Sequence, residues 1–349
     1  MAVDTVGIAG DAVSAWFAAH VPGASGTLRF TQIAGGRSNL TFAVQGADPA
    51  QRWVLRRPPL GRVSGNAHDV VREADVLRRV AGTGVPVPAV LGVCEDPGVN
   101  GAPFFVMERV DGAVLRRPDD FALFPAAEQR RRIALALIDE LARLHRADLD
   151  RSGWGARAGQ RGFIARQLGR WSDNWEADRV RVLADIGRTR DALAAAVPEQ
   201  QRASVVHGDF RLDNCLIAPD CSITGVLDWE LTTVGDPLAD LGHFLVYWAQ
   251  PGDEVTALQN PPTLVEGLPG RDELTGRYLD AMRGAVDADA APIDYYVAFS
   301  WWKTACIVEN VYTRMARGAM GDADRTPESF ALQAERLAAR AWELARALP

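Results

Sequence analysis

The sequence predicts an α+β fold with a small β-rich N-terminal lobe and a larger, mainly helical C-terminal lobe. Its 349 residues exceed one ordinary compact domain but suit two lobes that share a cleft. Short runs of strand-type residues fill the first third of the chain, whereas apolar residues at three- and four-residue spacing dominate the remainder. We therefore expect an N-terminal lobe over residues 1–110 and a C-terminal lobe over residues 111–349.

The N-terminal lobe is expected to contain an antiparallel sheet with a helix between its third and fourth strands. Apolar side chains recur at helical spacing from Val70 to Val80, and the glycines and prolines between Gly82 and Pro88 end that pattern. Short runs rich in Val, Leu, Phe and Trp lie before and after it, as is typical of strands. The predicted elements are a helix over 10–20, strands over 27–32, 39–44 and 53–56, a helix over 67–80, and strands over 89–94 and 103–107.

The C-terminal lobe is predicted to be mainly helical, with one β-rich segment inside it. Ala- and Leu-rich patterns repeat at helical spacing from about Phe121, and residues 204–229 interrupt them with three short apolar runs. Residues 249–270, which include four prolines, are expected to form a loop. The predicted helices cover 128–146, 164–182, 189–197, 237–248, 271–284, 293–318 and 328–348, and the predicted strands cover 204–206, 215–217 and 223–227.

Composition and charge indicate a globular cytoplasmic protein without a nucleic-acid or membrane partner. Hydrophobic residues make up 48% and charged residues 24%, which excludes disorder as a general description. A formal charge of −7 disfavours a nucleic-acid partner, since such binding needs a basic face. No stretch approaches the ~18 uninterrupted apolar residues of a membrane span, and the first residues lack a secretory signal pattern. The four cysteines form no CxxC pair, which favours a reducing compartment.

The β-rich segment carries the strongest chemical signal. Its stretch Val-Val-His-Gly-Asp-Phe-Arg-Leu-Asp-Asn, residues 205–214, ends a strand in a polar loop that holds Asp209 and, five residues on, Asn214. Two short apolar runs then form a predicted hairpin that returns the chain to Asp228. Carboxylate and amide oxygens are the ligands that Mg²⁺ prefers. The pattern therefore predicts that these three side chains converge.

Such convergence suits phosphoryl transfer, because one carboxylate must orient the acceptor while other oxygens hold Mg²⁺ against the nucleotide phosphates. Asp209 stands at the start of the loop, where it can face an acceptor, and Asn214 and Asp228 stand at the paired strand ends, which suits the metal. Taken singly, Asp209 is also typical of a turn and Asp228 of a helix cap. The sequence contains no G-x-x-x-x-G-K-[ST] loop, G-x-S-x-G elbow or H-E-x-x-H helix.

Four elements are linked in order along this part of the chain. They are His207-Gly208-Asp209, Asn214, Leu227-Asp228-Trp229-Glu230 and the run Gly-Asp-Pro-Leu-Ala-Asp-Leu-Gly over 235–242. Together they resemble the aminoglycoside phosphotransferase and choline-kinase family, which has a protein-kinase-like fold. The resemblance implies that Asp209 is the catalytic carboxylate and that His207 anchors its loop, with a general-base histidine as the weaker alternative. It also implies that Asp240 braces this loop through hydrogen bonds, whereas the plainer alternative is a solvated Asp in a first helical turn.

The N-terminal lobe is expected to bind the nucleotide. A kinase-like site needs a glycine-bearing turn over the phosphates, and the turn between the first two strands contains Gly36, Ser38 and Asn39. Backbone N–H groups and the Ser38 hydroxyl could cradle phosphate oxygens there, although a simple hairpin turn is the plainer alternative. The last strand leads into an inter-lobe hinge, where the backbone of Glu108 and Val110 could hydrogen-bond adenine.

The cation of this site departs from the family pattern, because Arg56 and Arg57 stand where the family commonly has a lysine. Strand alternation places Arg56 opposite to Trp53 and Leu55, so we assign Arg56 to the cleft, where a guanidinium can grip phosphate. Glu73 becomes the helix acid paired with it, with a solvated helix face as the alternative. The run Leu-Arg-Arg-Pro-Pro and the downstream Ala-His-Asp and Arg-Glu resemble a subfamily of stand-alone bacterial phosphotransferases and kinase-like domains fused to certain acyl-CoA dehydrogenases.

We predict an ATP- and Mg²⁺-dependent phosphotransferase that moves the γ-phosphate to a hydroxyl group of a small molecule. Aminoglycosides, choline-like alcohols, sugars and hydroxyacyl thioesters all fit, and the subfamily resemblance favours a hydroxyacyl or other metabolic acceptor. The alternative is a pseudokinase or nucleotide-binding scaffold without transfer activity, and the missing lysine is its main support. The sequence carries no signal for the oligomeric state.

Overall fold

The chain divides into two units in a computed structural model that describes residues 5–33, 39–60, 69–318 and 325–348. Unit 1 comprises Met1–Ala113, Cys215–Ala218 and Ile223–Thr232. Unit 2 comprises Val114–Asn214, Pro219–Ser222 and Thr233–Pro349. Two short segments from the predicted C-terminal lobe therefore belong to the unit that contains the N-terminal sheet.

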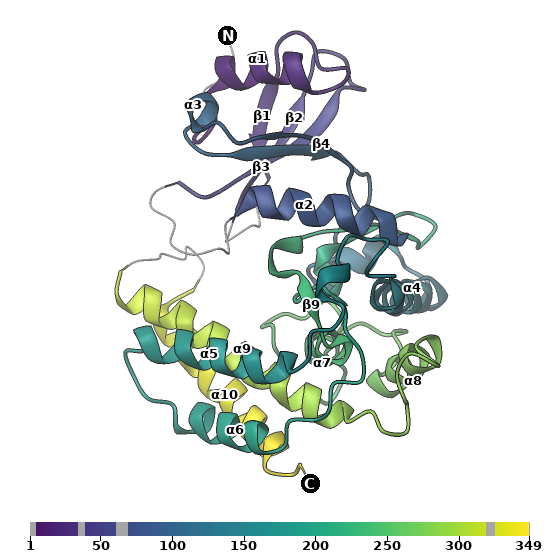
Figure 1. Cartoon of the computed structure of the whole chain (residues 1–349), viewed down its shortest axis with the longest axis vertical. Helices are drawn as coiled ribbons and strands as arrows, with labels where there is room; N and C mark the ends of the chain where they lie inside the picture. Colours follow the sequence, from purple (N-terminus) through teal and green to yellow (C-terminus); the bar gives the residue numbers. More distant parts are fainter. Residues whose placement is uncertain (1–4, 34–38, 61–68, 319–324, 349) are drawn as a thin grey trace. The chain divides into compact units, whose positions relative to one another are not determined.

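Unit 1 is built on a five-stranded antiparallel sheet with a helix on each face (Figure 1). The strand order is β1-β2-β3-β5-β4, so β5 lies between β3 and β4, and β4 forms an edge of the sheet. In the central pair, Leu55 of β3 lies opposite Val106 of β5. The elements are α1 (Gly10–His20), β1 (Arg29–Gln32), β2 (Leu40–Gln45), β3 (Arg52–Arg57), α2 (Val70–Val80), β4 (Val90–Cys94), α3 (Pro97–Asn100) and β5 (Phe104–Glu108).

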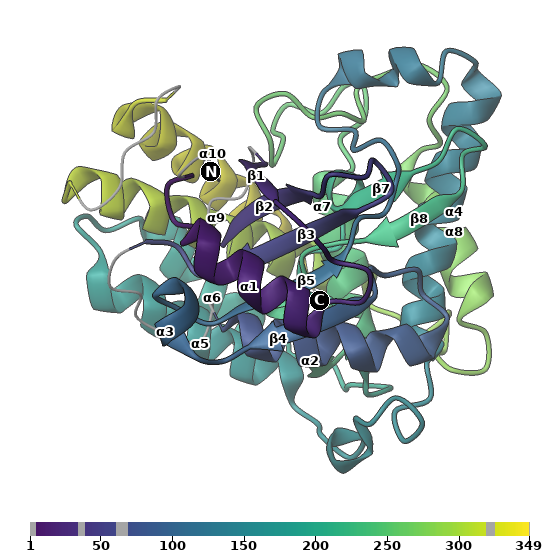
Figure 2. The same ribbon diagram turned by 90° about the horizontal axis from the view of Figure 1, so that it is seen from above.

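Alternation along β3 sends its side chains to opposite faces of the sheet. Trp53 and Leu55 join Phe17 of α1 in the hydrophobic core, and Figure 2 shows α1 lying over the strands. Burial of one such side chain stabilises the fold by ~1.5–3 kcal/mol. Arg56 instead lies on the face covered by α2, where it meets Glu73.

A short hairpin completes unit 1. Its strands β7 (Cys215–Ile217) and β8 (Ile223–Val226) pair antiparallel. Ile217 and Ala113 exchange backbone hydrogen bonds of 2.8 and 2.9 Å, and the N–H of Val226 donates to the carbonyl of Pro86 at 2.8 Å. These bonds attach the hairpin to the N-terminal part of the chain despite its distance in sequence.

Unit 2 is mainly helical and has α9 at its centre, packed against α5, α6, α7 and α10 (Figure 1). Its small sheet pairs β6 with β9, and Val205 lies opposite Val234. All residues of α7 from Pro237 to Val246 are buried, which makes this helix part of the core. The elements are α4 (Ala127–Arg146), α5 (Phe163–Asp178), α6 (Ala184–Ala195), β6 (Ser204–Val206), β9 (Thr233–Gly235), α7 (Pro237–Tyr247), α8 (Arg271–Ala281), α9 (Ile293–Ala316) and α10 (Pro327–Ala345).

The α+β fold class is confirmed, and several local predictions need correction. The helix predicted over 189–197 begins earlier, since α6 runs from Ala184 to Ala195 and its buried face includes Ile186. The helix predicted to reach residue 182 ends at Asp178, because Val180 and Val182, which extend the apolar pattern, are 44% and 70% exposed. The strand β9 was not predicted, since three residues are too few for an alternation signal and its partner β6 is remote in sequence. No helix in the part of the chain that the structure describes is long and apolar enough to cross a bilayer.

Candidate active site

The predicted site residues of unit 1 gather around Arg56. Its Nε lies 2.9 Å from a carboxylate oxygen of Glu73, and its Nη2 lies 2.6 Å from Asp228 Oδ1 and 3.5 Å from a carboxylate oxygen of Glu230. The buried amide of Asn39 donates to both glutamates, at 3.5 and 3.3 Å. One guanidinium therefore holds three carboxylates, one from α2 and two from the segment that contains Asp228 and Glu230.

Local structure explains how α2 presents Glu73. Asp69 caps the helix by accepting a hydrogen bond from the N–H of Arg72 at 2.9 Å, so Glu73 falls in the first turn. The guanidinium of Arg72 donates to the backbone carbonyls of Glu230 and Thr232, the first of these bonds being 2.9 Å long. The helix that carries Glu73 is thus tied to the segment that carries Asp228.

The Arg56 cluster contains three carboxylates but only one guanidinium. Burial, together with Asp228 and Glu230, raises the pKa of Glu73 to about 7, although Arg56 opposes the rise. Asp228 also holds a left-handed backbone conformation, with φ of 67°, which costs a residue other than glycine about 1–3 kcal/mol. An excess of oxygen anions on a strained backbone suits a site that receives a cation.

Arg57 does not share this role. Its guanidinium donates to the backbone carbonyls of Gly7 and Asn100, the second bond being 3.1 Å long, and burial lowers its pKa. It therefore ties β3 to the segments beside α1 and α3. The ion pair predicted between Arg56 and Glu73 is present, and Arg57 takes no part in it.

Other nucleotide-site predictions receive less information from the structure. Gly36 and Ser38 lie outside the described residues. The N–H of Glu108 donates to the carbonyl of Ala89 at 2.9 Å, so a contact between Glu108 and adenine would have to use its carbonyl. The role of Val110 in binding adenine stays a prediction.

The predicted site residues of unit 2 gather around Asp209. Its carboxylate accepts hydrogen bonds from His243 Nε2 at 2.8 Å and from Asn214 Nδ2 at 2.9 Å, and Arg211 Nε lies 3.1 Å away. Burial would raise the pKa of Asp209, but Arg211 and His243 outweigh it and hold that pKa well below its usual range. Asp209 is therefore an oriented anion at neutral pH.

Asp240 stabilises the loop that contains Asp209 through hydrogen bonds to its backbone. Its carboxylate accepts the backbone N–H groups of His207 at 2.6 Å and of Gly208 at 2.9 Å. Gly208 needs a left-handed φ of 87°, which glycine adopts without strain. Asp240 also meets Nε2 of His145 at 3.3 Å, and the hydroxyl of Tyr278 lies 2.7 Å from Nδ1 of that ring. The predicted hydrogen bonds between Asp240 and this loop are present.

His207 occupies an internal position. Its side chain is completely buried, and its Nδ1 accepts the backbone N–H of Asp209 at 3.2 Å. A ring that is fully enclosed and bonded to its own loop can hold the loop but cannot reach a bound acceptor. The geometry therefore favours the anchoring role over the general-base alternative.

The helix α7 delivers Asp240 because its start and its packing are both specified locally. Asp236 caps it by accepting the N–H of Leu238 at 3.1 Å, and Pro237 occupies the first helical turn. Gly242 allows a close approach to α9, since a Cβ there would lie 2.4 Å from the carbonyl oxygen of Tyr296. The helix is therefore held on both sides.

Three residues of the Asp209 cluster were missed by the sequence analysis. Arg211 follows Asp209 by two positions. His243 follows Asp240 by three positions, so these two residues share one face of the predicted helix, and this spacing could have revealed His243. Lys303, the only lysine of the chain, is buried in α9 and donates from Nζ to the carbonyl of Gly208 at 2.8 Å. Burial lowers its pKa.

The proposed metal ligands lie in different units, Asn214 in unit 2 and Asp228 in unit 1. Because Nδ2 of Asn214 donates to Asp209, the amide oxygen is the atom of Asn214 that could meet a cation. Among the described residues, no group of three His, Cys, Asp or Glu side chains is placed to hold a metal ion. An amide oxygen and a carboxylate are each ligand types that Mg²⁺ prefers, and the joint role of Asn214 and Asp228 stays a prediction.

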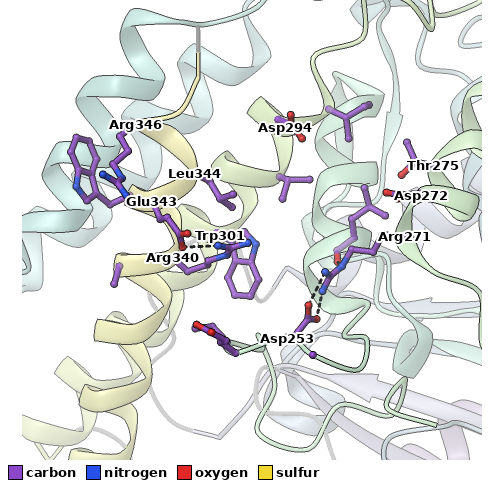
Figure 3. A pocket seen from close by; sticks show the side chains of 18 of the residues that line it. Asp253, Arg271, Asp272, Thr275, Asp294, Trp301, Arg340, Glu343, Leu344 and Arg346 are labelled. Carbon is purple, nitrogen blue, oxygen red and sulfur yellow. Dashed lines mark hydrogen bonds and ion pairs between the residues drawn. The ribbon is translucent and has the colours of Figure 1, made fainter. Parts of the chain in front are cut away.

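An open cavity of about 1210 Å³ lies elsewhere in unit 2, among α8, α9 and α10 (Figure 3). Trp301 contributes to its wall, and charged side chains around it pair with one another, as Arg340 does with Glu343 at 2.6 Å. None of the predicted site residues lines this cavity.

A comparison with family models decides the membership of the chain. The model described as "Phosphotransferase enzyme family" matches residues 29–283. The chain belongs to this family. The matched range contains both the Arg56 cluster and the loop around Asp209, but it ends before α9 and so does not include Lys303.

Relatives of this phosphotransferase-family chain are considerably longer. Mouse acyl-CoA dehydrogenase family member 10 is 32% identical over 329 residues, which cover 92% of this chain and 30% of the relative. Human acyl-CoA dehydrogenase family member 11 is 33% identical over 297 residues, which cover 84% of this chain and 37% of the relative. The chain thus spans about a third of their length.

Solved structures confirm the protein-kinase-like fold. A Ralstonia eutropha protein, named as a candidate aminoglycoside phosphotransferase, has a TM-score of 0.79 and 28% identity, with 96% of this chain and 98% of that one covered. Choline kinase from Cryptosporidium parvum has a TM-score of 0.62 at 13% identity, with 96% and 95% covered. The ADP-bound aminoglycoside phosphotransferase APH(2'')-Ib has a TM-score of 0.54 at 13% identity, with 97% of this chain and 99% of that one covered. The chain therefore has the fold of kinase-like phosphotransferases.

Proposed function

We propose that this protein transfers the γ-phosphoryl group of ATP to a hydroxyl group of a small molecule in the presence of Mg²⁺. The observation that carries the proposal is Asp209, an anion held by three donors on a loop that Asp240 braces. Phosphoryl transfer depends mainly on positioning and on electrostatic stabilisation, so a carboxylate of fixed orientation is the group it needs.

The residues around Asp209 and those around Arg56 would each supply a distinct part of the reaction. Asp209 accepts a hydrogen bond from the acceptor hydroxyl and so directs that oxygen toward the phosphorus. Arg56, which Glu73 orients, binds phosphate oxygens. Asn214 and Asp228 would hold Mg²⁺, which when bound neutralises charge on the nucleotide phosphates. Use of a nucleotide is further supported by the ADP that a structural neighbour binds.

The acceptor that we favour is a hydroxyacyl compound or another metabolic alcohol. The names of the mouse and human relatives associate this domain with acyl-CoA dehydrogenases, and the resemblance of the Leu-Arg-Arg-Pro-Pro strand supports the same class. Arg211 and Lys303 lie beside Asp209, and two cations there disfavour a polycationic aminoglycoside. Because the Ralstonia neighbour is named as a candidate aminoglycoside phosphotransferase, aminoglycosides are the second class of acceptor to assay.

The experiment begins with thermal shift in ATP, with and without Mg²⁺, since a ligand that binds the native state raises apparent stability. Transfer is then assayed on a panel of hydroxylated acceptors. We expect Asp209→Asn to lower turnover at least roughly 100-fold while it keeps the Mg²⁺-dependent ATP shift. Asp119→Asn, at an exposed position, is the matched control and should retain activity. Unchanged turnover in Asp209→Asn would refute the mechanism.

A nucleotide-binding scaffold is the second candidate, because Arg56 stands in place of the family's lysine and Asp228 is engaged by it. That reading predicts an ATP shift without turnover on any acceptor and without ATP hydrolysis. The two functions therefore separate in the same experiment.

A further inference from the structure

His243 lies directly behind the carboxylate of Asp209. It belongs to α7, one turn after Asp240, and only 3% of it is exposed. Its Nε2 is 2.8 Å from Asp209 Oδ1. One face of α7 thus provides two contacts to the same loop, since Asp240 binds the backbone and His243 binds the side chain.

The chemistry of this contact defines the state of the imidazole. An ionised carboxylate can only accept, so Nε2 must carry a hydrogen. Burial and the nearby Lys303 lower the pKa of His243, which favours the neutral ring with a bare Nδ1. That Nδ1 is buried and has no hydrogen-bond partner among the described residues.

Tyr247 supports both donors of Asp209. It follows His243 by one helical turn, and the two ring centroids are 4.6 Å apart. The guanidinium of Arg211 lies 5.0 Å from the centroid of the Tyr247 ring, and Arg211 Nε lies 3.1 Å from Asp209. Asp209, His243, Tyr247 and Arg211 therefore form a closed circuit of contacts in which no member can turn without disturbing the next.

We propose that His243 is a positioning residue, whose Nε2–H group fixes the orientation of the Asp209 carboxylate toward the acceptor hydroxyl. This inference rests on the phosphotransferase function proposed above. Tyr247 holds the imidazole and the guanidinium at the distances that this orientation requires. His243 does not touch the acceptor and does not exchange a proton with it. Its neutral ring acts through Asp209 alone.

The kinetic test compares two substitutions at one position. His243→Gln keeps an N–H donor within reach of Asp209, whereas His243→Leu fills similar space without a donor. We expect His243→Leu to lower kcat roughly 10- to 100-fold, because a misplaced catalytic group costs about that much, with the KM for ATP changed less than about twofold. His243→Gln should recover most of the lost rate. Equal rates for the two variants at equal thermal stability would overturn the proposal.

A spectroscopic test does not depend on the acceptor. Nitrogen-15 spectra of the histidine rings should show His243 as a neutral ring, protonated at Nε2 and bare at Nδ1, with slow exchange of the Nε2 hydrogen. His243→Gln assigns the signal among the five histidines of the chain. Asp209→Ala should remove the slow exchange. A wild-type ring protonated at Nδ1, or one in fast exchange, would overturn the proposal even if the enzyme is active.

The two tests separate this inference from the proposed function. If wild-type protein transfers phosphate to no acceptor, the phosphotransferase function fails, and with it any catalytic purpose for His243. If wild-type protein is active but the spectrum lacks the Nε2 hydrogen bond, only the positioning inference fails. Activity together with the slow Nε2–H signal and the Gln rescue supports both.

Discussion

The Nε of Arg56 lies 2.9 Å from the carboxylate of Glu73, and this ion pair links β3 to α2 within unit 1. The family commonly has a lysine at this strand position. A lysine ammonium is a compact point charge, whereas the planar guanidinium reaches Glu73 and Asp228 with different nitrogens at the same time. The arginine is therefore suited to hold several carboxylates at once.

Arg56→Met should destabilise unit 1 by about 3–5 kcal/mol, because it leaves buried carboxylates without their counter-charge. It should also abolish the ATP-dependent thermal shift. Arg56→Lys should restore part of both properties, since one of the contacts can still form. Arg52→Met on the same strand removes an exposed pair with Asp111 and should have a much smaller effect on chemical denaturation. Comparable losses in the two methionine variants would contradict this account.

Tyr278→Phe should slow the proposed reaction although the residue reaches the Asp209 loop only through His145 and Asp240. The substitution removes the hydroxyl that bonds His145, and His145 in turn meets Asp240. We expect a loss of about 1–3 kcal/mol in the free energy of unfolding, together with a lower kcat.

The control for Tyr278 is Tyr295→Phe, which removes a buried hydroxyl bonded to the carbonyl of Leu193 at 2.8 Å. Both variants should lose similar stability in urea denaturation. Only Tyr278→Phe should change kcat, because the Tyr295 bond does not lead to the Asp209 loop. If kcat falls equally in both variants, the lower kcat results from the lower stability of unit 2 and not from the contacts of Tyr278.

Stability should fall between about pH 4 and pH 6 on account of Asp236. Burial raises the pKa of this carboxyl to about 6, from an ordinary value of 3.8. A carboxyl with a raised folded-state pKa contributes its stability fully below the unfolded value and loses it as the pH rises through about 6. The contribution lost is about 3 kcal/mol, at roughly 1.4 kcal/mol for each pKa unit.

The measurement is urea denaturation of wild-type protein and Asp236→Asn across this pH range. Asparagine keeps one acceptor oxygen for the capping N–H of Leu238, and its Nδ2 can donate to the hydroxyl oxygen of Tyr296, which donates to Asp236 in the wild-type protein. It does not titrate, so the variant should gain stability relative to wild type as the pH rises from 4 to 7. Parallel pH profiles would show that Asp236 is not the responsible group.

Gly242→Ala should destabilise unit 2 by more than an ordinary helix substitution. The added Cβ would lie 2.4 Å from the carbonyl oxygen of Tyr296, so α7 and α9 would have to separate. We expect a cost of about 1–3 kcal/mol from overpacking. Gly187→Ala in α6 meets nothing within 4 Å and should instead stabilise the protein by about 0.5–1 kcal/mol. Thermal unfolding of the two variants should therefore shift in opposite directions.

Much of the fold was predictable because its signals are local. The helix α1 occupies residues 10–20 as expected, and the alternation of β3 correctly separated Arg56 from Trp53 and Leu55. The hairpin β7–β8 also follows its apolar runs. Where local signals mislead, as at Val180 and Val182, the apolar residues are exposed to solvent and so do not extend the helix.

The candidate site was predictable only in part. Asp209 and Asp240 could be found because motif spacing marks them, and the structure brings them to one loop. Motif spacing could not predict that His243 contacts Asp209 or that Lys303 contacts Gly208. Each joins a helix to the loop across a stretch of chain whose path local spacing does not determine.

The sequence by itself determined most of the helices and strands in their order and the acidic and amide groups of the motifs, and its strand alternation favoured Arg56 over Arg57 for the cleft. These depend on side-chain periodicity, on caps and on residue chemistry, all of which act over a few positions. Only the tertiary structure decided that Arg56 holds Asp228 as well as Glu73, and that the imidazole of His243 contacts the carboxylate of Asp209. Such pairings join residues that are 34 and 172 positions apart, and they form only when packing of the core brings their elements together.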